Sequence, residues 1–437
     1  MKRYFSIVMS ILLVTSLHSQ DDVYPSKEYK GLLFITNATI HVGNGQVISN
    51  GTVKVNNGKI EQAGTDIPVP AGDVKVFNVQ GKHVYPGLIL PVTNLGLIEV
   101  PNGGRPTADL TELGQLNPNI RSIVAYNTDS KVINTLRSNG ILLAGIAPQG
   151  ALLSGSSSVV QLDAWNWEDA AYKTENGIYF NMPNLIVRPN PFAIFFGIPQ
   201  TPAAEALKRA MEQIEEVKSF FREAKVYFAE SNHSETNLKF EAVKGLFEKK
   251  QKFFIRCDLV KEMLVAIDFV KEFGFDVVIA GGSESWQIPE LLKQNNIAVI
   301  LNQPHNLPTL ADDDVDQPYK TASMLHKAGV LFAINDDDGQ TRGRNLPFNA
   351  GTAAAYGLGK EEALSAITLN AAKILGIADK TGSIEAGKDA NIVVSEGDIL
   401  DMRSSIITHA FIQGRMIDLN DKHKQLYERY KHKYGLK

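Results

Sequence analysis

Four apolar segments recur between helix-like stretches in the middle of this chain, and they constrain its fold more than any other feature. They read Phe253-Phe254-Ile255, Val277-Val278-Ile279-Ala280, Ile297-Ala298-Val299-Ile300-Leu301 and Val330-Leu331-Phe332-Ala333-Ile334. Apolar runs of this length, separated by helical segments, are typical of parallel strands that are buried on both faces. The alternation predicts an α/β fold with a (β/α)₈ barrel at residues 85–384, close to the usual size of about 250 residues plus insertions.

The main alternative for such a chain is an open, doubly wound sheet. That fold binds nucleotides through a glycine-rich loop, and the sequence has neither a dinucleotide fingerprint nor a Walker loop. One predicted helix of the barrel follows Thr201-Pro202, with Thr201 as its N-cap. Its apolar positions recur at helical spacing and are expected to form one stripe facing the core. They are Leu207, Met211, Ile214, Val217 and Phe221.

Both ends of the chain have the pattern of short β-strands joined by tight turns. Asn56-Asn57-Gly58 predicts a type I′ hairpin turn, because Asn and Gly tolerate positive φ angles. A second hairpin is expected around Gln413-Gly414. We therefore expect one small β-sandwich domain built from residues 21–84 and 385–417, followed by a basic helical tail at 418–437.

Residues 1–20 are expected to be a signal peptide rather than part of the fold. Lys2 and Arg3 precede a mostly apolar stretch from Tyr4 to Val14, which is too short to span a bilayer. The alternative is a buried N-terminal helix. No cysteine follows the apolar stretch, which argues against a lipoprotein anchor. These features predict a secreted or periplasmic protein without a transmembrane segment.

The charge of the chain argues against nucleic-acid binding, and its cysteine content excludes an intramolecular disulfide. The chain has 44 Lys+Arg and 48 Asp+Glu, a net charge of −4, which gives no basic footprint for nucleic acid. Its single cysteine, Cys257, excludes an intramolecular disulfide, so the core must supply the stability. Whether Cys257 is a reactive thiol or a buried structural residue stays open at this point.

A further segment precedes the four apolar segments in the sequence and reads Pro86-Gly87-Leu88-Ile89-Leu90-Pro91-Val92-Thr93-Asn94-Leu95-Gly96. It resembles the first barrel strand of the amidohydrolase superfamily, metal-dependent hydrolases of amides, lactams and related C–N bonds. In that family the strand reads Pro-Gly-Leu-Ile-Asp-x-His-x-His-x-Gly. Residues 360–372 and 382–390 are similar to the family's last barrel helix and its return to the small sheet. Within the family, the chain is most similar to the imidazolonepropionase-like secreted branch, which implies a hydrolase of non-peptide C–N bonds.

The resemblance also shows a degenerate metal site. Where the family has its two first-strand histidines, this chain has Val92 and Asn94. The fifth-strand histidine corresponds to Arg256 and the sixth-strand histidine to Gly281. A catalytic zinc site needs about three protein ligands, and an arginine in the same cavity would repel a cation. The resemblance therefore implies that no metal cofactor is bound; the fourth-strand ligand cannot be located by motif.

The eighth strand of the family supplies a catalytic aspartate, which by register corresponds to Asp337, with Asp336 next. Asp337 and Arg256 are thus the candidate catalytic residues. Without a metal, a buried carboxylate needs another counter-charge, and a guanidinium can bond it through two donors. We expect Arg256 to approach Asp337. The alternative is that Arg256 turns toward solvent and residues 336–338 cap the following segment.

Other residues offer weaker candidates. Among the nine histidines none has ligand spacing, and only His305 directly follows a predicted barrel strand, which makes it a candidate pocket residue or an ordinary loop histidine. Ser154-Gly155-Ser156-Ser157-Ser158 lacks the frame of a nucleophile elbow. It is expected to be a flexible loop at the barrel mouth.

Two functions remain at this stage. The chain could be a catalytically impaired hydrolase, with Asp337 as base and Arg256 as electrostatic stabiliser. It could instead be a non-catalytic protein that binds a small molecule or supports a related active amidohydrolase, as a homo-oligomer or in a pair. Because the family's reaction needs a metal to activate water, the residues favour the second function.

Overall fold

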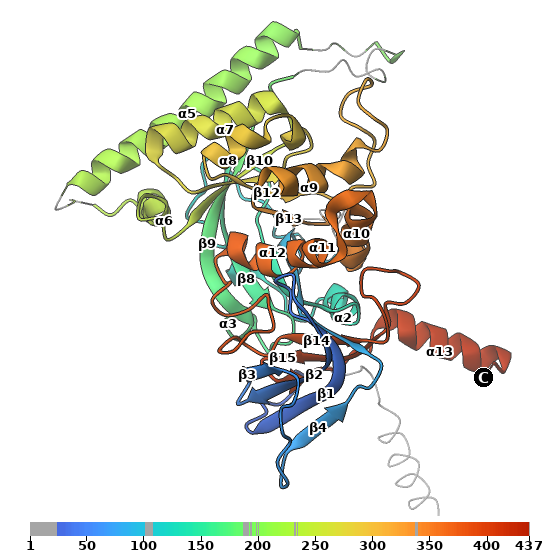
Figure 1. Cartoon of the computed structure of the whole chain (residues 1–437). Coiled ribbons are helices and arrows are strands. Elements are labelled where there is room, and N and C mark those ends of the chain that lie inside the picture. Colours follow the sequence, from blue (N-terminus) through green and yellow to red (C-terminus); the bar gives the residue numbers. More distant parts are fainter. Residues whose placement is uncertain are drawn as a thin grey trace, which may run out of the picture.

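The computed structural model describes most of the chain, and two eight-stranded sheets organise it (Figure 1). The residues described are 24–100, 108–186, 192, 195–197, 199, 201–230, 233, 235–336 and 340–436. The expected signal peptide at 1–20 and the candidate Asp337 lie outside these residues.

One sheet is a nearly closed barrel with the strand order β13-β12-β11-β10-β9-β8-β7-β6. Its strands are β6 (Leu88–Thr93), β7 (Ile141–Ile146), β8 (Leu153–Gln161), β9 (Ala171–Asn181), β10 (Lys252–Cys257), β11 (Val277–Gly281), β12 (Ala298–Leu301) and β13 (Phe332–Ile334). The four apolar segments of the sequence are β10 to β13, and these pair in parallel with their neighbours. The predicted barrel fold is confirmed.

The barrel departs from the expected parallel arrangement at its third strand. β8 runs antiparallel to both β7 and β9. The cause is the connection from β7, which is the loop 147–152: a parallel crossover needs a dozen or more residues, whereas an antiparallel return does not. The expectation of a flexible loop at residues 154–158 was therefore wrong. These residues are a fully buried part of β8.

A side chain bridges the seam between the first and last strands of the barrel. The Oδ1 atom of Asn335, which follows β13, accepts a hydrogen bond from the backbone N–H of Val92 at 3.1 Å. The register of β6 shifts between Leu90 and Thr93, around Pro91, which has no N–H to donate to a ladder. The seam thus places the end of β6 beside the end of β13.

Helices cover the outside of the barrel (Figure 1). Those between its strands are α2 (Lys131–Arg137), α3 (Trp167–Ala170), α5 (Ala203–Ala229), α6 (Leu238–Phe247), α7 (Val260–Phe273), α8 (Pro289–Gln294) and α9 (Gln317–Ala328). Those after β13 are α10 (Leu346–Ala353), α11 (Lys360–Ala366) and α12 (Leu369–Leu375). Short turns of other helix types lie at η2 (Ser122–Ala125), η3 (Ser285–Gln287), η4 (Gln340–Asn345) and η5 (Ala354–Leu358).

The long helix α5 buries only part of its apolar stripe. Ile214, Val217 and Phe221 are buried as predicted, but Leu207 and Met211 are 43% and 49% exposed. With 27 residues the helix is about 40 Å long, and its two ends extend past the helices that it packs on (Figure 1). Helical spacing determines which residues share a face, but the neighbouring elements decide how much of that face is covered.

The second sheet is assembled from both ends of the chain. Its strand order is β16-β15-β14-β5-β1-β2-β3, and β4 also pairs with β1. The strands are β1 (Leu32–His41), β2 (Val47–Asn56), β3 (Lys59–Gly64), β4 (Lys75–Asn78), β5 (His83–Pro86), β14 (Ile392–Ser395), β15 (Ile407–Ile412) and β16 (Arg415–Met416). The pairing of β5 with β14 joins the two ends and confirms the expected composite β-domain, while its predicted boundaries stay a prediction.

Two hairpin turns predicted from the sequence pack against each other in this sheet. Asn57 and Gly58 have φ angles of 47° and 78°, and Gln413 and Gly414 have 49° and 75°. Positive values at two successive residues are those of the type I′ turn that was predicted at Asn56-Asn57-Gly58. A Cβ atom on Gly58 would lie 2.5 Å from the carbonyl oxygen of Gln413, so no larger residue fits at this contact.

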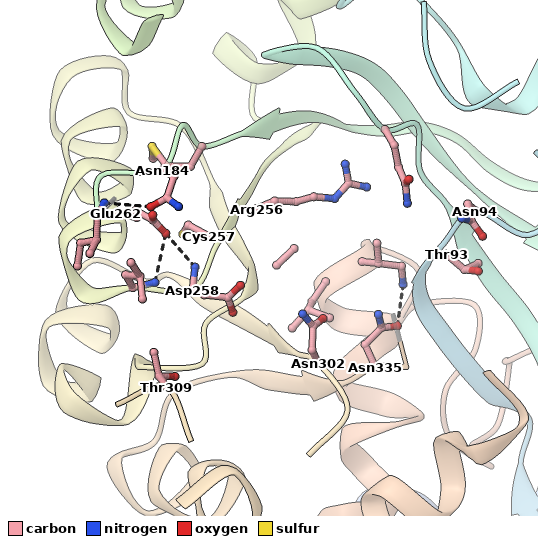
Figure 2. A pocket seen from close by; sticks show the side chains of 17 residues that line it. Thr93, Asn94, Asn184, Arg256, Cys257, Asp258, Glu262, Asn302, Thr309 and Asn335 are labelled. Atoms are coloured by element: carbon pink, nitrogen blue, oxygen red, sulfur yellow. Dashed lines mark hydrogen bonds between the residues drawn. The ribbon is translucent and has the colours of Figure 1, made fainter. Parts of the chain in front are cut away.

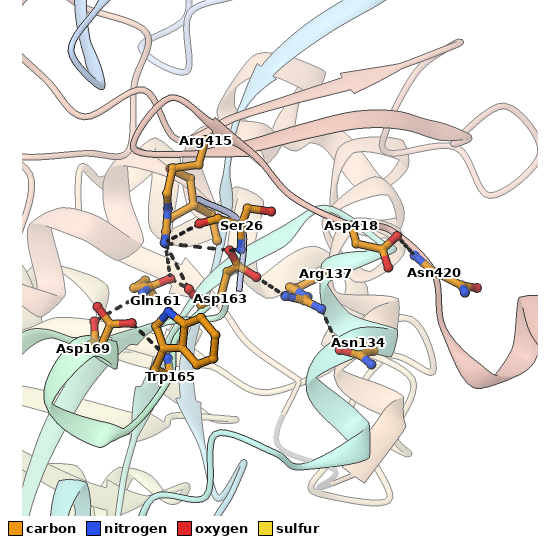
Figure 3. A network of polar contacts seen from close by, with 11 residues as sticks. Ser26, Asn134, Arg137, Gln161, Asp163, Trp165, Asp169, Arg415, Asp418 and Asn420 are labelled. Carbon is orange, nitrogen blue, oxygen red and sulfur yellow. Dashed lines mark hydrogen bonds and ion pairs between the residues drawn. The ribbon is translucent and has the colours of Figure 1, made fainter. Parts of the chain in front are cut away.

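A buried polar network joins the small sheet to the barrel (Figure 3). Asp163, two residues after the end of β8, pairs with Arg137 at the end of α2, and both side chains are almost fully buried. Its Oδ2 atom accepts from the backbone N–H of Ser26 at 2.9 Å. Arg415 of β16 donates to the carbonyl oxygen of Asp163 at 3.0 Å and to that of Ser26 at 3.3 Å. The network therefore connects both chain ends with the barrel.

The basic tail forms α13 (Lys422–Tyr434), which projects from the body of the molecule and has no buried residue (Figure 1). Asp421 caps it by accepting from the backbone N–H groups of His423 and Lys424. Among the described residues, no helix combines the length and the apolar character that crossing a membrane requires.

Candidate functional site

A cavity of about 630 Å³ lies at the carboxyl ends of the barrel strands (Figure 2). Barrel enzymes keep their chemistry at this end of the strands, and the volume lies within the range of small-molecule sites. Its wall includes three of the positions singled out in the sequence, Val92, Asn94 and Arg256. It also includes residues that the sequence reasoning missed, among them Thr93, Gln149, Met182, Asn184, Asp258, Glu262, Ala280, Asn302, Thr309 and Asn335.

Arg256 points into the cavity from β10 rather than outward to solvent. Its Nη1 atom donates to the carbonyl oxygen of Pro148 at 2.9 Å and to Oδ1 of Asn181 at 3.0 Å. The guanidinium also lies over the ring of Tyr179, 4.5 Å from the ring centroid. Burial lowers the pKa of the Arg256 guanidinium from its ordinary value. The side chain is thus held in place by an amide, a carbonyl and an aromatic face.

Asn181 ends β9, the fourth strand of the barrel, in which no ligand position could be located by motif. It is the residue paired with Arg256 in the ladder between β9 and β10. Besides accepting from Arg256, its Nδ2 donates to the carbonyl oxygen of Ala151 at 2.7 Å. Asn181, Asn302 and Asn335 all end or directly follow a barrel strand. The rule that barrel sites lie at strand ends would have found them.

Gly281 does not line this cavity. The ladder pairs Arg256 with Ala280, and Ala280 is the residue of β11 that lines the cavity. Gly281 has a φ angle of 119°, and a Cβ atom there would lie 2.8 Å from Oδ1 of Asp258. It borders a narrower pocket of about 60 Å³ together with Trp286 and Leu301. A histidine would not fit at position 281 without a local rearrangement.

The remaining candidates lie away from the cavity or outside the described residues. His305 is exposed in the loop after β12, with Nε2 3.3 Å from Oγ1 of Thr352. Asp336 is buried and accepts from Nδ2 of Asn349 at 3.1 Å, and it is not part of the cavity wall. Asp337 lies outside the described residues, so its pairing with Arg256 stays a prediction.

The two acidic residues of the cavity wall, Glu262 and Asp258, accept hydrogen bonds from groups of the protein itself. Both carboxylate oxygens of Glu262 accept from backbone N–H groups: Oε2 from Asp258 and Leu259 at 3.2 and 3.3 Å, and Oε1 from Leu185 at 3.4 Å. Oδ1 of Asp258 accepts from the hydroxyl of Ser283 at 2.6 Å. These bonds fix the start of α7 and the turn after β11.

The donor set does not fit the family's metal ion. The strand-end positions in the cavity wall hold Val92, Asn94, Arg256 and Ala280, and none of these is a histidine or a carboxylate. Throughout the described part of the chain, no group of three or more His, Cys, Asp or Glu residues could hold a metal ion. A catalytic zinc needs about three such ligands, and the Arg256 charge opposes a cation.

Cys257 lies in the cavity wall but is buried, and we predict that it is unreactive in the folded protein. Burial raises the pKa of its thiol well above the ordinary value, and Glu262 and Asp258 raise it further. A higher pKa leaves less thiolate at pH 8, so labelling by a disulfide reagent should be roughly 100-fold slower in native than in urea-unfolded protein. Because Cys257 is the single cysteine, the absorbance change of the labelling reaction measures the labelling of Cys257 directly. Rates within tenfold of each other would contradict the prediction.

Comparisons with known proteins identify relatives over different parts of the chain. A family model described as Amidohydrolase family matches residues 262–417. The imidazolonepropionase of Flavobacterium psychrophilum is 29% identical over 157 residues, which cover 31% of this chain and 38% of that protein. The imidazolonepropionase of Thermoplasma volcanium is 40% identical over 86 residues, 19% of this chain and 21% of that protein. The matches thus span well under two thirds of these relatives.

A solved structure matches nearly the whole fold. The amidohydrolase from Thermotoga maritima MSB8 superposes with a TM-score of 0.75 at 27% identity, covering 88% of this chain and 99% of that chain. The structural match extends over both the barrel and the composite sheet. The family model, which matches residues 262–417, covers only part of each. The chain belongs to the amidohydrolase superfamily.

Proposed function

We propose that this chain is a member of the amidohydrolase superfamily that binds a small molecule in its barrel-mouth cavity without a metal ion and without hydrolysing it. The observation that carries the proposal is Arg256, a guanidinium directed into the cavity from the fifth-strand position. A fixed positive charge there disfavours a cation and favours an anionic or polar ligand. The cavity volume of about 630 Å³ supports a ligand of small-molecule size.

The residues also explain why hydrolysis is not expected. The superfamily's reaction depends on a metal that lowers the pKa of water and polarises a carbonyl group. The cavity wall of this chain supplies amide, hydroxyl and guanidinium groups, and its two carboxylates already accept hydrogen bonds from the structure around them. These groups can bind and orient a polar molecule, whereas none of them replaces a metal as activator of water.

Metal analysis of purified, dialysed protein tests the proposal. We expect less than about 0.1 equivalent of zinc, since the wall lacks the three ligands of a catalytic site. A matched variant with Val92→His, Asn94→His and Arg256→His restores three imidazoles at the strand ends and should retain more zinc than the unchanged protein. Stoichiometric zinc at the barrel mouth of the unchanged protein would overturn the metal-free assignment. Turnover of imidazolonepropionate by metal-free protein would overturn the non-hydrolytic assignment.

A further inference from the structure

The basic helix α13 (Lys422–Tyr434) extends away from the body of the protein (Figure 1). At its first turn, Nε2 of His423 lies 3.3 Å from Nη1 of Arg344, which belongs to η4. Beyond that turn the helix continues for more than two turns, and none of its residues is buried in the described structure. Helices in proteins are stabilised mainly by packing of one face, so the exposed faces of α13 are available for a partner.

Three tyrosines form one exposed face of α13. Tyr427, Tyr430 and Tyr434 follow each other at intervals of three and four residues, which places them on the same side of the helix. Their exposed fractions are 62%, 52% and 65%. A tyrosine combines an apolar ring with a polar hydroxyl, and such side chains are enriched where water meets an apolar phase. The face therefore has the character of an interfacial contact.

Cations border the tyrosine face on both sides. The helix contains five Lys and Arg residues and one Glu, which leaves four net positive charges in a chain whose net charge is −4. With 3.6 residues per turn, Lys433 and Arg429 lie on one side of the tyrosines, and Lys424 and Lys431 lie on the other. The positive charge of α13 thus complements an anionic surface.

The tyrosines and the cations are close enough to contact one surface together. The Nζ atom of Lys433 lies 5.2 Å from the ring centroid of Tyr434, and that of Lys431 lies 5.5 Å from the ring centroid of Tyr427. Lys431 also pairs with Glu428 at 3.8 Å, a surface ion pair of small energy. Helices with aromatic residues on one face and Lys or Arg beside it bind at the headgroup level of membranes.

We propose that α13 docks the protein on the surface of a membrane that contains anionic phospholipids. The helix lies parallel to the bilayer, with its tyrosine rings among the headgroups and its cations at the lipid phosphates. An acidic protein would attract the same cations, but it would not require a row of exposed tyrosines. This inference goes beyond the proposed function, because it involves neither the cavity at the barrel mouth nor Arg256.

Vesicle flotation of the purified chain tests the charge requirement. At about 50 mM NaCl, phosphatidylcholine vesicles with about 30% phosphatidylglycerol should bind the protein at least roughly tenfold more strongly than vesicles of phosphatidylcholine alone. At about 500 mM NaCl this preference should fall by roughly fivefold or more, because salt screens exposed charges. Equal binding to both kinds of vesicle, or binding to neither, would overturn the proposal.

Two triple variants with the same loss of charge establish whether α13 makes the contact. One removes three exposed cations of α13: Lys424→Gln, Arg429→Gln and Lys433→Gln. It should bind anionic vesicles roughly tenfold or more weakly, since each Lys or Arg near such a surface strengthens binding roughly fivefold. The matched control removes three exposed cations of α5 and should stay within about twofold of the unchanged protein: Lys208→Gln, Arg209→Gln and Lys225→Gln. Equal losses would mean that net charge, and not α13, determines binding.

A third triple variant tests the tyrosine face. Tyr427→Ser, Tyr430→Ser and Tyr434→Ser together should weaken binding to anionic vesicles by roughly tenfold or more, because the rings no longer enter the interface. Phenylalanine at the same three positions keeps the rings and should bind within about threefold of the unchanged protein. Since no residue of α13 is buried, thermal unfolding of all these variants should match that of the unchanged protein.

Immobilised poly-L-glutamate distinguishes a membrane from an acidic protein partner, because it offers negative charge without a lipid interface. The unchanged protein should bind it at least roughly tenfold more weakly than the anionic vesicles. Binding of equal strength to both, or vesicle binding that persists after the serine substitutions, would show that α13 recognises any acidic surface and would overturn the membrane assignment. The metal content of the protein has no bearing on these outcomes, so the proposed function is tested separately.

Discussion

Asp163→Asn is expected to lower the free energy of unfolding by about 3–5 kcal/mol, the cost of breaking a buried ion pair by removing one partner. The substitution keeps the size of the side chain but leaves the charge of Arg137 buried without its carboxylate. Arg415, whose Nη2 lies 3.9 Å from Oδ2 of Asp163, loses a second favourable interaction. Because this network joins both chain ends to the barrel (Figure 3), the effect should extend to the small sheet.

Urea unfolding monitored by circular dichroism measures this loss. Glu205→Gln is the matched control, since it removes the carboxylate of an exposed ion pair with Arg209 on α5. That substitution should stay within about 0.5 kcal/mol, as for other exposed pairs. A loss of similar size in the two variants would show that burial of the Asp163 pair has no special effect.

Phe221→Ala should cost about 3–5 kcal/mol, the range for truncating a buried phenylalanine. Phe221 is fully buried on α5 and contacts an aromatic cluster formed by β10, α7 and the segment that follows α7. Its ring centroid lies 5.2 Å from that of Phe253 and 5.0 Å from that of Phe275. The smaller side chain leaves a cavity between helix and barrel that neighbouring rings fill incompletely.

The control for this prediction comes from the same helix. Leu207 belongs to the same apolar stripe in the sequence but is 43% exposed. Leu207→Ala should therefore change stability by no more than about 0.5 kcal/mol, as expected away from the core. Chemical denaturation measures the free energy of unfolding of both variants. It thereby compares a buried position, Phe221, with an exposed position, Leu207, of the same predicted apolar stripe. Equal losses would mean that the exposed half of α5 is covered in solution.

Much of the fold follows from local sequence patterns. Apolar runs predicted β10 to β13 because each is short enough to lie in one buried strand. Asn57-Gly58 and Gln413-Gly414 predicted their turns, because those residue types accept the positive φ angles observed. The direction of β8 did not follow from any local pattern. It depends on the loop after β7 being too short for a crossover, which becomes evident once both strand boundaries are known.

The candidate site was predictable in part. Val92, Asn94 and Arg256 were located by the resemblance, and all three line the cavity. Gly281 was assigned to the same cavity, but β11 presents Ala280 there, because the ladder pairs Ala280 with Arg256. A displacement of one residue along a strand moves a side chain to the opposite face. No motif marked Asn181 or Tyr179, the residues that hold the guanidinium in place.

The sequence by itself determined strands β10 to β13 and the turns at Asn57-Gly58 and Gln413-Gly414, because each depends on residues close together in the chain. The tertiary structure decided what surrounds Arg256. Its two hydrogen-bond partners lie 108 and 75 residues away along the chain. Such contacts depend on the pairing and closure of the barrel strands, and local patterns do not specify them.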